Sequence, residues 1–203
     1  MDLINQPLTD KGRKTVDDLV ASARFHFYKN GYNKTKIKDI TNTANTSVGA
    51  FYLYFQDKYS LYKYIVEQYG LEIRSKIKAR TGKTSNRREA ERQGLITFIE
   101  LVRENPDMYN ILWESIYIDK EIFFNYYRDF AASYIRQIQR AGEQGEVTTE
   151  NPEVLAYILI GAHTFLGIRY GMMQNDEDIN EVADEFMNVL ENGIFTKPNE
   201  KGS

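Results

Sequence analysis

Residues 31–58 contain two short helical patterns with only a few residues between them. In the first pattern Ile37 and Ile40 are three residues apart, a spacing that places both on one face of a helix. In the second pattern Phe51 and Phe55 are four residues apart, so they are expected to point into a common core. Because so few residues separate the two patterns, they must be joined by a tight turn. The segment is therefore predicted to form a helix-turn-helix.

The residues of the turn fit a sharp corner. Asn45 lies where the first helix has to stop, and asparagine tolerates the left-handed backbone conformation that such corners commonly use. Thr35 is expected to cap the first helix, because hydroxyl oxygens accept hydrogen bonds from the free amides of a first helical turn. Thr46 or Ser47 is expected to cap the second helix in the same way.

Small, hydroxyl-bearing and aromatic residues occupy the outer side predicted for the second helix. Such a surface is unusual toward solvent but suits DNA, because glycine admits the sugar-phosphate backbone, alanine can contact a thymine methyl group and tyrosine can bond phosphates. The candidate DNA-binding residues are Thr35, Lys36, Thr46, Ser47, Val48, Gly49, Ala50, Tyr52, Tyr54 and Lys58. The phosphate contacts among them are expected from Thr35, Lys36, Tyr54 and Lys58. Val48 fits two positions, since its spacing to the buried phenylalanines equally allows a place in the core.

Over residues 11–65 the chain resembles the DNA-binding domain of the TetR (tetracycline-repressor) family. The residues that carry the resemblance are Gly31, Tyr32, Thr35, Ile37, Ile40, Ala44, Asn45, Thr46, Ser47, Gly49, Phe51, Tyr52, Tyr54, Phe55, Lys58 and Leu61. Asn45 stands where the family usually has Gly, Thr46 where it often has Val, and Val48 where Lys or Arg is frequent. The first two changes preserve the turn, whereas Val48 removes a possible cationic contact. The resemblance implies a homodimeric, ligand-responsive transcriptional repressor.

The charge distribution agrees with DNA binding through one end of the chain. The 203 residues have a formal net charge of -3, which by itself disfavours binding to a polyanion. Residues 1–80, however, hold 14 Lys and Arg against 8 Asp and Glu, whereas residues 81–203 hold 12 against 21. The basic part thus coincides with the predicted helix-turn-helix, and the acidic remainder favours binding through one face only.

Helical periodicity runs through almost the whole chain, and no alternating stretch is long enough to predict a strand. The predicted fold class is all-α, with about nine helices. Residues 1–57 are expected to form a three-helix DNA-binding domain that contains the helix-turn-helix. Residues 58–203 are expected to form a larger helical domain for ligand binding and dimerisation, with residues 58–80 as the connecting helix. Further helices are expected over residues 12–30, 87–104, 120–143 and 178–194, and from residue 152 onward.

The last two predicted helices indicate a dimer. The segment 154–173 is apolar nearly all round, and the helix over 178–194 has a wide apolar face, so both need a partner surface. Packed as a four-helix bundle in a two-fold dimer, they would set two recognition helices about 34–36 Å apart, the spacing of successive major grooves. The candidate interface residues are Leu159, His163, Leu166, Val182, Phe186 and Leu190. Packing of both helices within a single chain is the alternative.

Between residues 108 and 134 the chain carries more aromatic residues than one amphipathic face requires. Some of them are expected to line a cavity for a small, mostly apolar or amphipathic molecule. The candidate ligand-binding residues are Trp113, Tyr117, Phe124, Tyr127, Phe165 and Tyr170. Aromatic residues at helical spacing are also typical of an ordinary core, which is the alternative. No cofactor is expected besides this effector.

The sequence gives little sign of an enzyme or a metal site. It contains no cysteine, which excludes a thiol nucleophile and a Cys-based metal site. No phosphate-binding glycine loop and no paired metal-ligand motif is present, and His26 lies far from His163. Residues 1–14 lack an apolar signal segment, and Arg169 interrupts the apolar stretch over 154–173. A cytoplasmic protein without a membrane span is therefore expected.

The expected function is repression of transcription that ends when a small, mostly apolar molecule releases the dimer from a near-palindromic operator. Two other classes of function fit the same patterns. A helical scaffold or protein-interaction module could use the helix-turn-helix for protein contact alone. A DNA-binding regulator could also activate transcription or require a corepressor. Selection of a near-palindromic site from genomic fragments separates a regulator from a scaffold.

Overall fold

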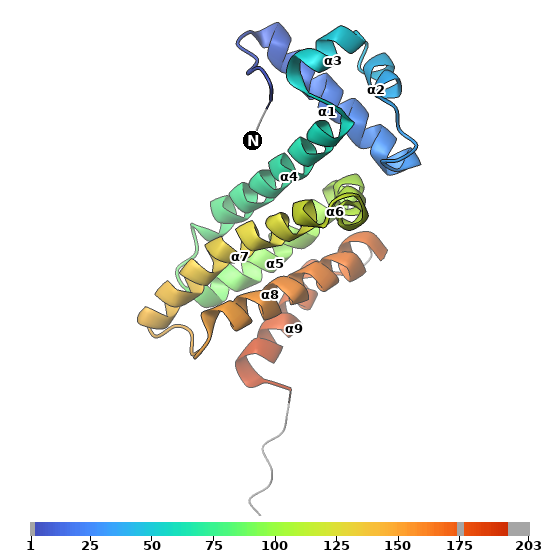
Figure 1. Ribbon diagram of the computed structural model, residues 1–203. Helices are drawn as coiled ribbons and strands as arrows, with labels where there is room; N and C mark the ends of the chain where they lie inside the picture. Colours follow the sequence, from blue (N-terminus) through green and yellow to red (C-terminus); the bar gives the residue numbers. More distant parts are fainter. Residues whose placement is uncertain (1–2, 174–176, 195–203) are drawn as a thin grey trace, which may run out of the picture.

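The computed structural model describes residues 3–173 and 177–194, and every regular element in these ranges is a helix (Figure 1). The N-terminal helices are α1 (Asp10–Asn30), α2 (Ile37–Thr43) and α3 (Val48–Tyr54). They are followed by α4 (Lys58–Thr81), α5 (Arg87–Glu104), α6 (Pro106–Ile118), α7 (Lys120–Glu143), α8 (Pro152–Gly167) and α9 (Ile179–Asn192). The end of α8 continues as a π-helical segment over Ile168–Met173. The all-α prediction is confirmed.

Local capping explains where several helices begin. Asp57 precedes α4, and its carboxylate accepts a hydrogen bond from the backbone N–H of Ser60 at 2.7 Å. Asn86 precedes α5 and accepts a hydrogen bond from the backbone N–H of Glu89 at 2.9 Å. These side chains satisfy amides that have no partner within the first helical turn. Helices α5 and α7 begin and end at the predicted residues.

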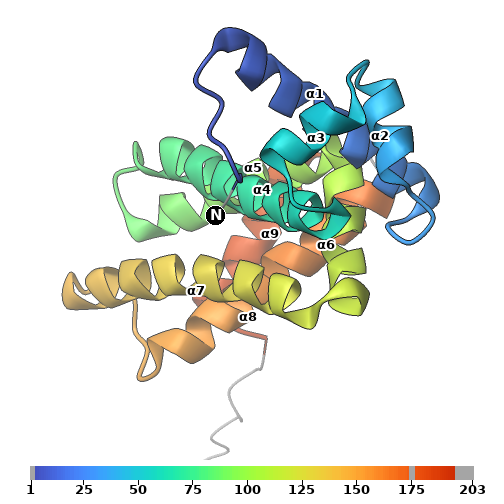
Figure 2. The same cartoon turned by 45° about the horizontal axis from the view of Figure 1, so that its top comes forward.

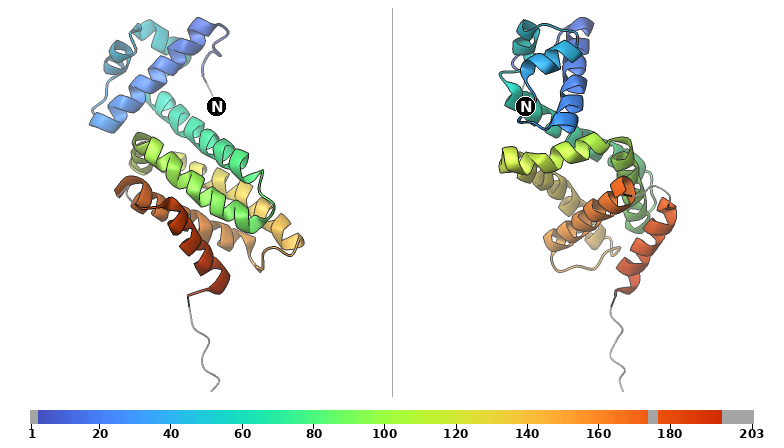
Figure 3. Two further views of the ribbon diagram at one scale, coloured as in Figure 1. Left: turned by 180° about the vertical axis from the view of Figure 1, so that it is seen from behind. Right: turned by 90° about the vertical axis from the view of Figure 1, so that its right-hand side faces the viewer.

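The helices are arranged along the molecule from one end to the other. Helices α1, α2 and α3 form an N-terminal group at one end, while α8 and α9 lie toward the opposite end (Figures 1 and 3). Helix α4 leads from this group into the helical body, where α5 packs against both α4 and α9. Helix α7 packs against α6 and α8. The N-terminal group is therefore separated from α8 and α9 by the rest of the helical body.

A continuous apolar core joins the N-terminal group to the helical body. It runs from Val16 of α1 through Ile65 of α4 to Leu112 of α6. Tyr62 of α4 is fully buried within it, and its hydroxyl donates a hydrogen bond to the carbonyl of Ile111. The N-terminal group and the helical body therefore share one close-packed interior.

Helix α8 approaches α5 closely near its C-terminal end. A Cβ atom on Gly167 would lie 2.7 Å from Phe98, and one on Gly171 would lie 2.6 Å from Val102. Glycine permits this approach, as expected for a helix pressed against another. Within the described residues, the stretch Pro152–Met173 is the one helix long and apolar enough to span a membrane, and 39% of its most apolar window is buried. Core helices of soluble proteins also meet this test of length and composition.

Candidate DNA-binding surface and effector cavity

The turn between α2 and α3 has the predicted backbone. Asn45 has a φ of 49°, and within the described part of the chain it is the one non-glycine residue with a positive φ. The backbone N–H of Thr46 donates to the carbonyl of Thr41 at 3.0 Å, which closes the turn. Ser47 caps α3, because its Oγ accepts a hydrogen bond from the backbone N–H of Ala50 at 3.0 Å. The predicted left-handed corner is confirmed.

Helix α3 buries one face and leaves the other in solvent, on the outside of the N-terminal group (Figure 2). Phe51 is fully buried, as its spacing predicted. On the other side Val48 is 42% exposed, Tyr52 50% and Leu53 54%, and Gly49 is exposed as well. Of the two positions that the sequence allowed for Val48, the structure therefore has the outer one.

The candidate DNA-binding surface is the set of residues from the loop before α2, from α2, from the turn and from α3 that reach solvent. Its members are Lys34, Lys36, Lys38, Thr46, Ser47, Val48, Gly49, Ala50, Tyr52 and Leu53, of which Thr46 and Ala50 are half-buried. The sequence analysis did not select Lys34, Lys38 or Leu53. The alternate spacing of the three lysines was the signal for the first two, whereas Leu53 carries no local signal.

Three of the predicted phosphate contacts are corrected, because the structure turns these side chains inward. Thr35 is 1% exposed, and its hydroxyl donates to the carbonyl of Gly31 at 2.8 Å instead of capping α2. Tyr54 is 9% exposed and belongs to the apolar core. The Nζ of Lys58 donates to two backbone carbonyls of the loop before α2, at 2.6 and 2.7 Å. Thr35 and Tyr54 are thus buried, and the half-buried Lys58 already donates two hydrogen bonds within its own chain.

Polar contacts hold the N-terminal group against α6. Arg24 of α1 donates two hydrogen bonds to the carboxylate of Asp107, at 2.8 and 3.0 Å, and one to the side chain of Asn105 at 3.2 Å. Glu114 of α6 accepts a hydrogen bond at 2.9 Å from the backbone N–H of Tyr32, in the loop between α1 and α2. We call these the α1–α6 contacts. Because Arg24 and Asp107 are 29% and 23% exposed, solvent screens this pair less than a surface pair.

A further link joins α4 to the end of α6. The hydroxyl of Tyr59 donates to the carboxylate of Asp119, and this bond, with burial, raises the pKa of Tyr59 to about 12. The same bond lowers the pKa of Asp119. Burial lowers the pKa of Lys58, while the nearby carboxylate of Glu114 acts in the opposite direction. The bond from Tyr59 thus ties the start of α4, the helix that follows the N-terminal group, to the end of α6.

A cavity of about 600 Å³ lies between α4, α5 and α7. The apolar side chains that line the cavity include Ile77, Phe98 and Phe130. Its cationic side chains include Arg74, Lys78 and Arg136. Lys78 and Arg136 are exposed, so the cationic side chains mark the solvent side of the cavity. Asp129 lies 4.0 Å from Arg74 and offsets part of that charge. The lining combines apolar and polar side chains with a basic rim, a mixture that suits an amphipathic anion.

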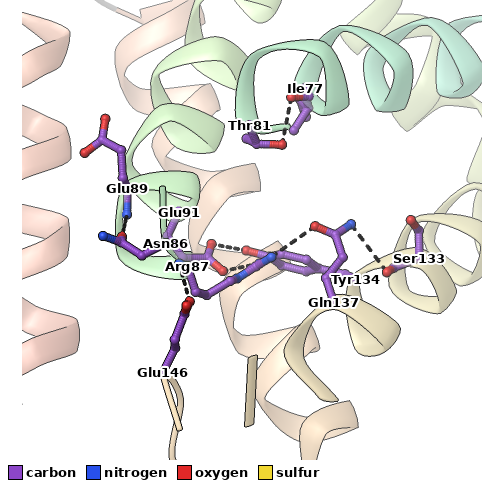
Figure 4. A network of polar contacts seen from close by, with 10 residues as sticks. All are labelled: Ile77, Thr81, Asn86, Arg87, Glu89, Glu91, Ser133, Tyr134, Gln137 and Glu146. Atoms are coloured by element: carbon purple, nitrogen blue, oxygen red, sulfur yellow. Dashed lines mark hydrogen bonds and ion pairs between the residues drawn. The ribbon is translucent and has the colours of Figure 1, made fainter. Parts of the chain in front are cut away.

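A buried polar network lines part of this cavity (Figure 4). Arg87 of α5 donates to Glu91 and, at 3.0 Å, to Gln137 of α7. Tyr134 of α7 donates to Glu91 as well, and the Arg87 guanidinium lies 4.9 Å from the centre of the Tyr134 ring. Burial raises the pKa of Tyr134 well above its ordinary value, so its hydroxyl remains a donor. The network joins α5 to α7 through a carboxylate that is both paired and hydrogen-bonded.

His163 of α8 also lines the cavity and is 8% exposed. Its ring centre lies 6.3 Å from that of Phe98, 6.4 Å from that of Tyr134 and 5.5 Å from that of Phe186. Burial lowers its pKa, so the imidazole is neutral at neutral pH. Because Phe186 belongs to α9, His163 connects the cavity with the last helix.

A second hollow, of about 490 Å³, is an aromatic groove between α6, α7 and α8. Four of the six predicted ligand-binding residues line this groove, namely Trp113, Phe124, Tyr127 and Phe165. The other two predictions are corrected. Tyr117 is 91% exposed, so it cannot line a pocket. Tyr170 packs against the cluster of α5 and α9, and its carbonyl accepts a hydrogen bond from Arg103 at 2.9 Å.

Two of the predicted dimer-interface residues are corrected, because Leu159 and His163 are buried inside their own chain. The other predicted residues are partly buried or exposed, namely Leu166, Val182, Phe186 and Leu190. The exposed apolar residues that we call the α8–α9 outer face are Val154, Tyr157, Ile158, Phe165, Val189, Leu190 and Ile194. Because α8 is apolar on every side, its periodicity does not show which side faces inward.

The exposed α3, its left-handed turn and the helical body together define an all-α protein of the helix-turn-helix class. Residues 19–65 match the family model described as bacterial regulatory proteins, tetR family. Over these residues the resemblance inferred from the sequence is confirmed. Among the residues that the structure describes, no group of three or more His, Cys, Asp or Glu side chains is placed to hold a metal ion.

Solved structures share the fold over most of the chain. The fatty acid degradation regulator FadR from Bacillus halodurans is 14% identical and superposes with a TM-score of 0.77, covering 90% of this chain and 97% of its own. A putative TetR-family regulator from Syntrophomonas wolfei is 18% identical, with a TM-score of 0.77 and coverage of 88% and 95%. FadR from Bacillus subtilis in complex with stearoyl-CoA is 12% identical, with a TM-score of 0.74 and coverage of 88% and 99%. Curated protein sequences contain no match to the chain.

Proposed function

We propose that this protein is a homodimeric transcriptional repressor that leaves a near-palindromic operator when an effector binds. The observation that carries the proposal is the exposed face of α3. Val48, Gly49 and Tyr52 point outward from this helix, which carries no charged side chain, while Lys34 and Lys36 are exposed in the loop before α2. Uncharged groups on a protruding helix fit base edges, and exposed lysines fit phosphates.

The proposed roles follow from the exposed groups. Tyr52 and Val48 contact bases or the sugar-phosphate backbone from the middle of α3, and Gly49 allows the backbone of DNA to come close. Thr46, Ser47 and Ala50 lie at the start of the same helix and complete the DNA-facing side. Lys36, together with Lys34 and Lys38, contacts phosphates. In this assignment residues 1–57 are the DNA-binding domain, and residues 58–203 bind the effector and the second subunit.

The α8–α9 outer face supports the dimer. Tyr157 is 44% exposed, Ile158 58% and Phe165 65%, an unusual amount of apolar surface for one helix of a monomer. On α9, Val189 and Leu190 are also exposed, at 38% and 39%. A second copy of the chain with the same face would bury both helices as a four-helix bundle. The two α3 helices would then belong to one particle at the end opposite to this bundle.

The cavity between α4, α5 and α7 is the proposed effector site. Its apolar walls would hold a chain or ring, while Arg74, Lys78 and Arg136 would bind an anionic group. The structure of Bacillus subtilis FadR in complex with stearoyl-CoA supports an amphipathic effector of this kind. The aromatic groove is the second candidate for the site, since it contains most of the predicted ligand-binding residues.

The α1–α6 contacts offer a route from the cavity to the DNA. An effector between α4, α5 and α7 would shift α4, and the shared core would then move the N-terminal group against α6. Because a ligand shifts an equilibrium only by its differential affinity, a coupling of about 1–3 kcal/mol gives a 5- to 150-fold response. The proposal includes a cytoplasmic location and no catalytic activity.

Selection of sites from genomic fragments tests the proposal. The protein should retain a near-palindromic site, and a Tyr52→Ala variant should lose roughly tenfold or more of the preference for that site over random duplex. Adding stearoyl-CoA as the first effector probe should release the wild-type complex. If the wild-type protein selected no DNA site, the result would favour a scaffold. If stearoyl-CoA strengthened DNA binding, the result would favour a corepressor-dependent regulator.

A further inference from the structure

The segment before α1 lies against the end of α3. We call residues 3–9 the N-terminal arm; in Figure 2 it runs back from the start of α1 toward the rest of the chain. The backbone N–H of Ile4 donates to the carbonyl of Tyr54 at 2.9 Å. The side-chain amide of Asn5 donates to the carbonyl of Leu53 at 2.7 Å. Two consecutive residues of the arm thus bond the last two carbonyls of α3.

These bonds matter because α3 is short. It has seven residues, and a helix of this length is unstable unless other parts of the protein hold it. The last carbonyls of any helix lack partners within the helix. The backbone N–H of Phe55 satisfies the carbonyl of Phe51 at 2.9 Å. The arm supplies the donors for Leu53 and Tyr54.

The arm is itself held at both ends. Leu3 packs against the apolar core. At the other end Thr9 caps α1, since its Oγ accepts a hydrogen bond from the backbone N–H of Gly12 at 3.1 Å. A Cβ atom on Gly12 would lie 2.9 Å from the hydroxyl of Tyr54, so the first turn of α1 touches the last turn of α3. The arm therefore connects the start of α1 with the end of α3.

We infer that Asn5 is a positioning residue for DNA recognition. Its amide bonds the carbonyl of Leu53, a residue whose side chain is exposed next to Tyr52 on the candidate DNA-binding surface. Without this bond the carbonyl of Leu53 loses its donor and the last turn of α3 is held less firmly, so both side chains shift relative to the base edges. Asn5 need not touch DNA for this effect. The inference rests on the proposed function, because it presupposes that α3 contacts DNA.

The test compares Asn5→Ala with Gln6→Ala, since Gln6 is an exposed polar neighbour in the same arm. Affinities for the selected operator and for a random duplex of equal length are measured over a range of salt concentrations. Asn5→Ala should lower the ratio of the two affinities about fivefold to tenfold, while the salt dependence stays unchanged because the phosphate contacts remain. Gln6→Ala should leave both quantities unchanged.

A second variant addresses the other donor. Ile4→Pro removes the backbone N–H that bonds the carbonyl of Tyr54, and it should lower the same ratio. The inference would be overturned if Asn5→Ala left the ratio of the two affinities unchanged. It would also be overturned if the variant lost affinity equally for both duplexes and had a lower melting temperature, because the arm would then be a purely structural element. Failure of the wild type to prefer any site would instead contradict the proposed function.

Discussion

Single lysines of the N-terminal group differ in what surrounds their ammonium groups. Lys34, Lys36 and Lys38 are exposed beside the start of α2. Lys58 instead bonds two backbone carbonyls, and its Nζ lies 4.1 Å from the centre of the Tyr32 ring. The sequence analysis gave Lys36 and Lys58 the same role, because residue type and spacing do not show which carbonyls a folded loop brings near. Their expected effects on DNA binding are therefore different.

Replacing Lys36 by Ala should weaken binding to operator and random duplex alike. The slope of log K against log salt should become shallower by about 0.9, the value expected when a protein neutralises one phosphate fewer. Fluorescence anisotropy with a labelled duplex at several salt concentrations measures the slope. Lys58→Met is the matched control: it should lower the melting temperature and keep the wild-type slope. A shallower slope in Lys58→Met with an unchanged slope in Lys36→Ala would show that Lys58, and not Lys36, contacts the phosphate.

His163 makes stability depend on pH. Burial lowers its pKa below the ordinary value of 6.5, so between pH 6.5 and the folded-state pKa the unfolded chain binds a proton that the folded chain does not. The free energy of unfolding should therefore fall as the pH drops below 6.5, with a slope of at most about 1.4 kcal/mol per pH unit from this group. Urea unfolding at pH 7.0, 6.0 and 5.5 measures this slope. His163→Phe should flatten it, and an equally steep slope in that variant would assign the effect to other groups.

Among the helices, the position of α6 against α1 is the most consequential contact. Helix α6 begins at Pro106, a residue type favoured at the first position of a helix, and the side chain of Asn105 before it makes no cap bond. Nothing in the sequence of α6 indicates that Asp107 bonds Arg24 of α1, which lies 83 positions earlier in the chain. The same holds for Glu114, which bonds the backbone of Tyr32, 82 positions earlier. The contact arises because the core between α1, α4 and α6 fixes the three helices together.

Removing one partner of the α1–α6 contacts should be costly. Asp107→Ala leaves the partly buried guanidinium of Arg24 without its carboxylate, a loss of about 1–3 kcal/mol in the free energy of unfolding. The exposed pair of Lys14 and Asp18 provides the matched control, since Asp18→Ala should cost about 0.5 kcal/mol or less. Urea unfolding of both variants measures the difference. Equal losses would mean that solvent screens the two pairs alike.

For the molecule as a whole, the distribution of apolar surface decides the assembly. Helices α8 and α9 lie at the end opposite to α2 and α3 (Figure 3), and they carry the residues of the α8–α9 outer face. Pairing through it would leave both candidate DNA-binding surfaces free. The acidic remainder of the chain would lie away from the DNA, which favours binding through one face of the particle.

Ile158→Glu should convert the proposed dimer into a folded monomer, because Ile158 is 58% exposed and a glutamate there stays hydrated in the free chain. Affinity for the near-palindromic operator should fall by at least about tenfold, since a monomer can occupy only one of the two half-sites. Analytical ultracentrifugation and circular dichroism measure the mass and the helicity. Leu159→Glu, at the adjacent buried position, should unfold the protein instead. A dimeric Ile158→Glu variant would exclude this face as the interface.

Features that depend on near neighbours along the chain could be predicted from the sequence alone. Helix starts follow from caps such as Asn86, and the corner between α2 and α3 follows from the left-handed tolerance of Asn45. Phe51 is buried because helical periodicity alone assigns it to the inner face. These signals act over three or four residues, so they are present in the chain before it folds.

Packing of the helices, in contrast, selected which side of each apolar helix faces inward and which polar groups meet. Leu159 is inside and Ile158 outside because α8 is apolar all round, so the positions of α5 and α7 select its inner face. Thr35 and Lys58 turn inward because the folded loop before α2 presents carbonyls that need donors. Contacts of this kind join residues far apart in the chain, and their energies exist only once the helices are packed.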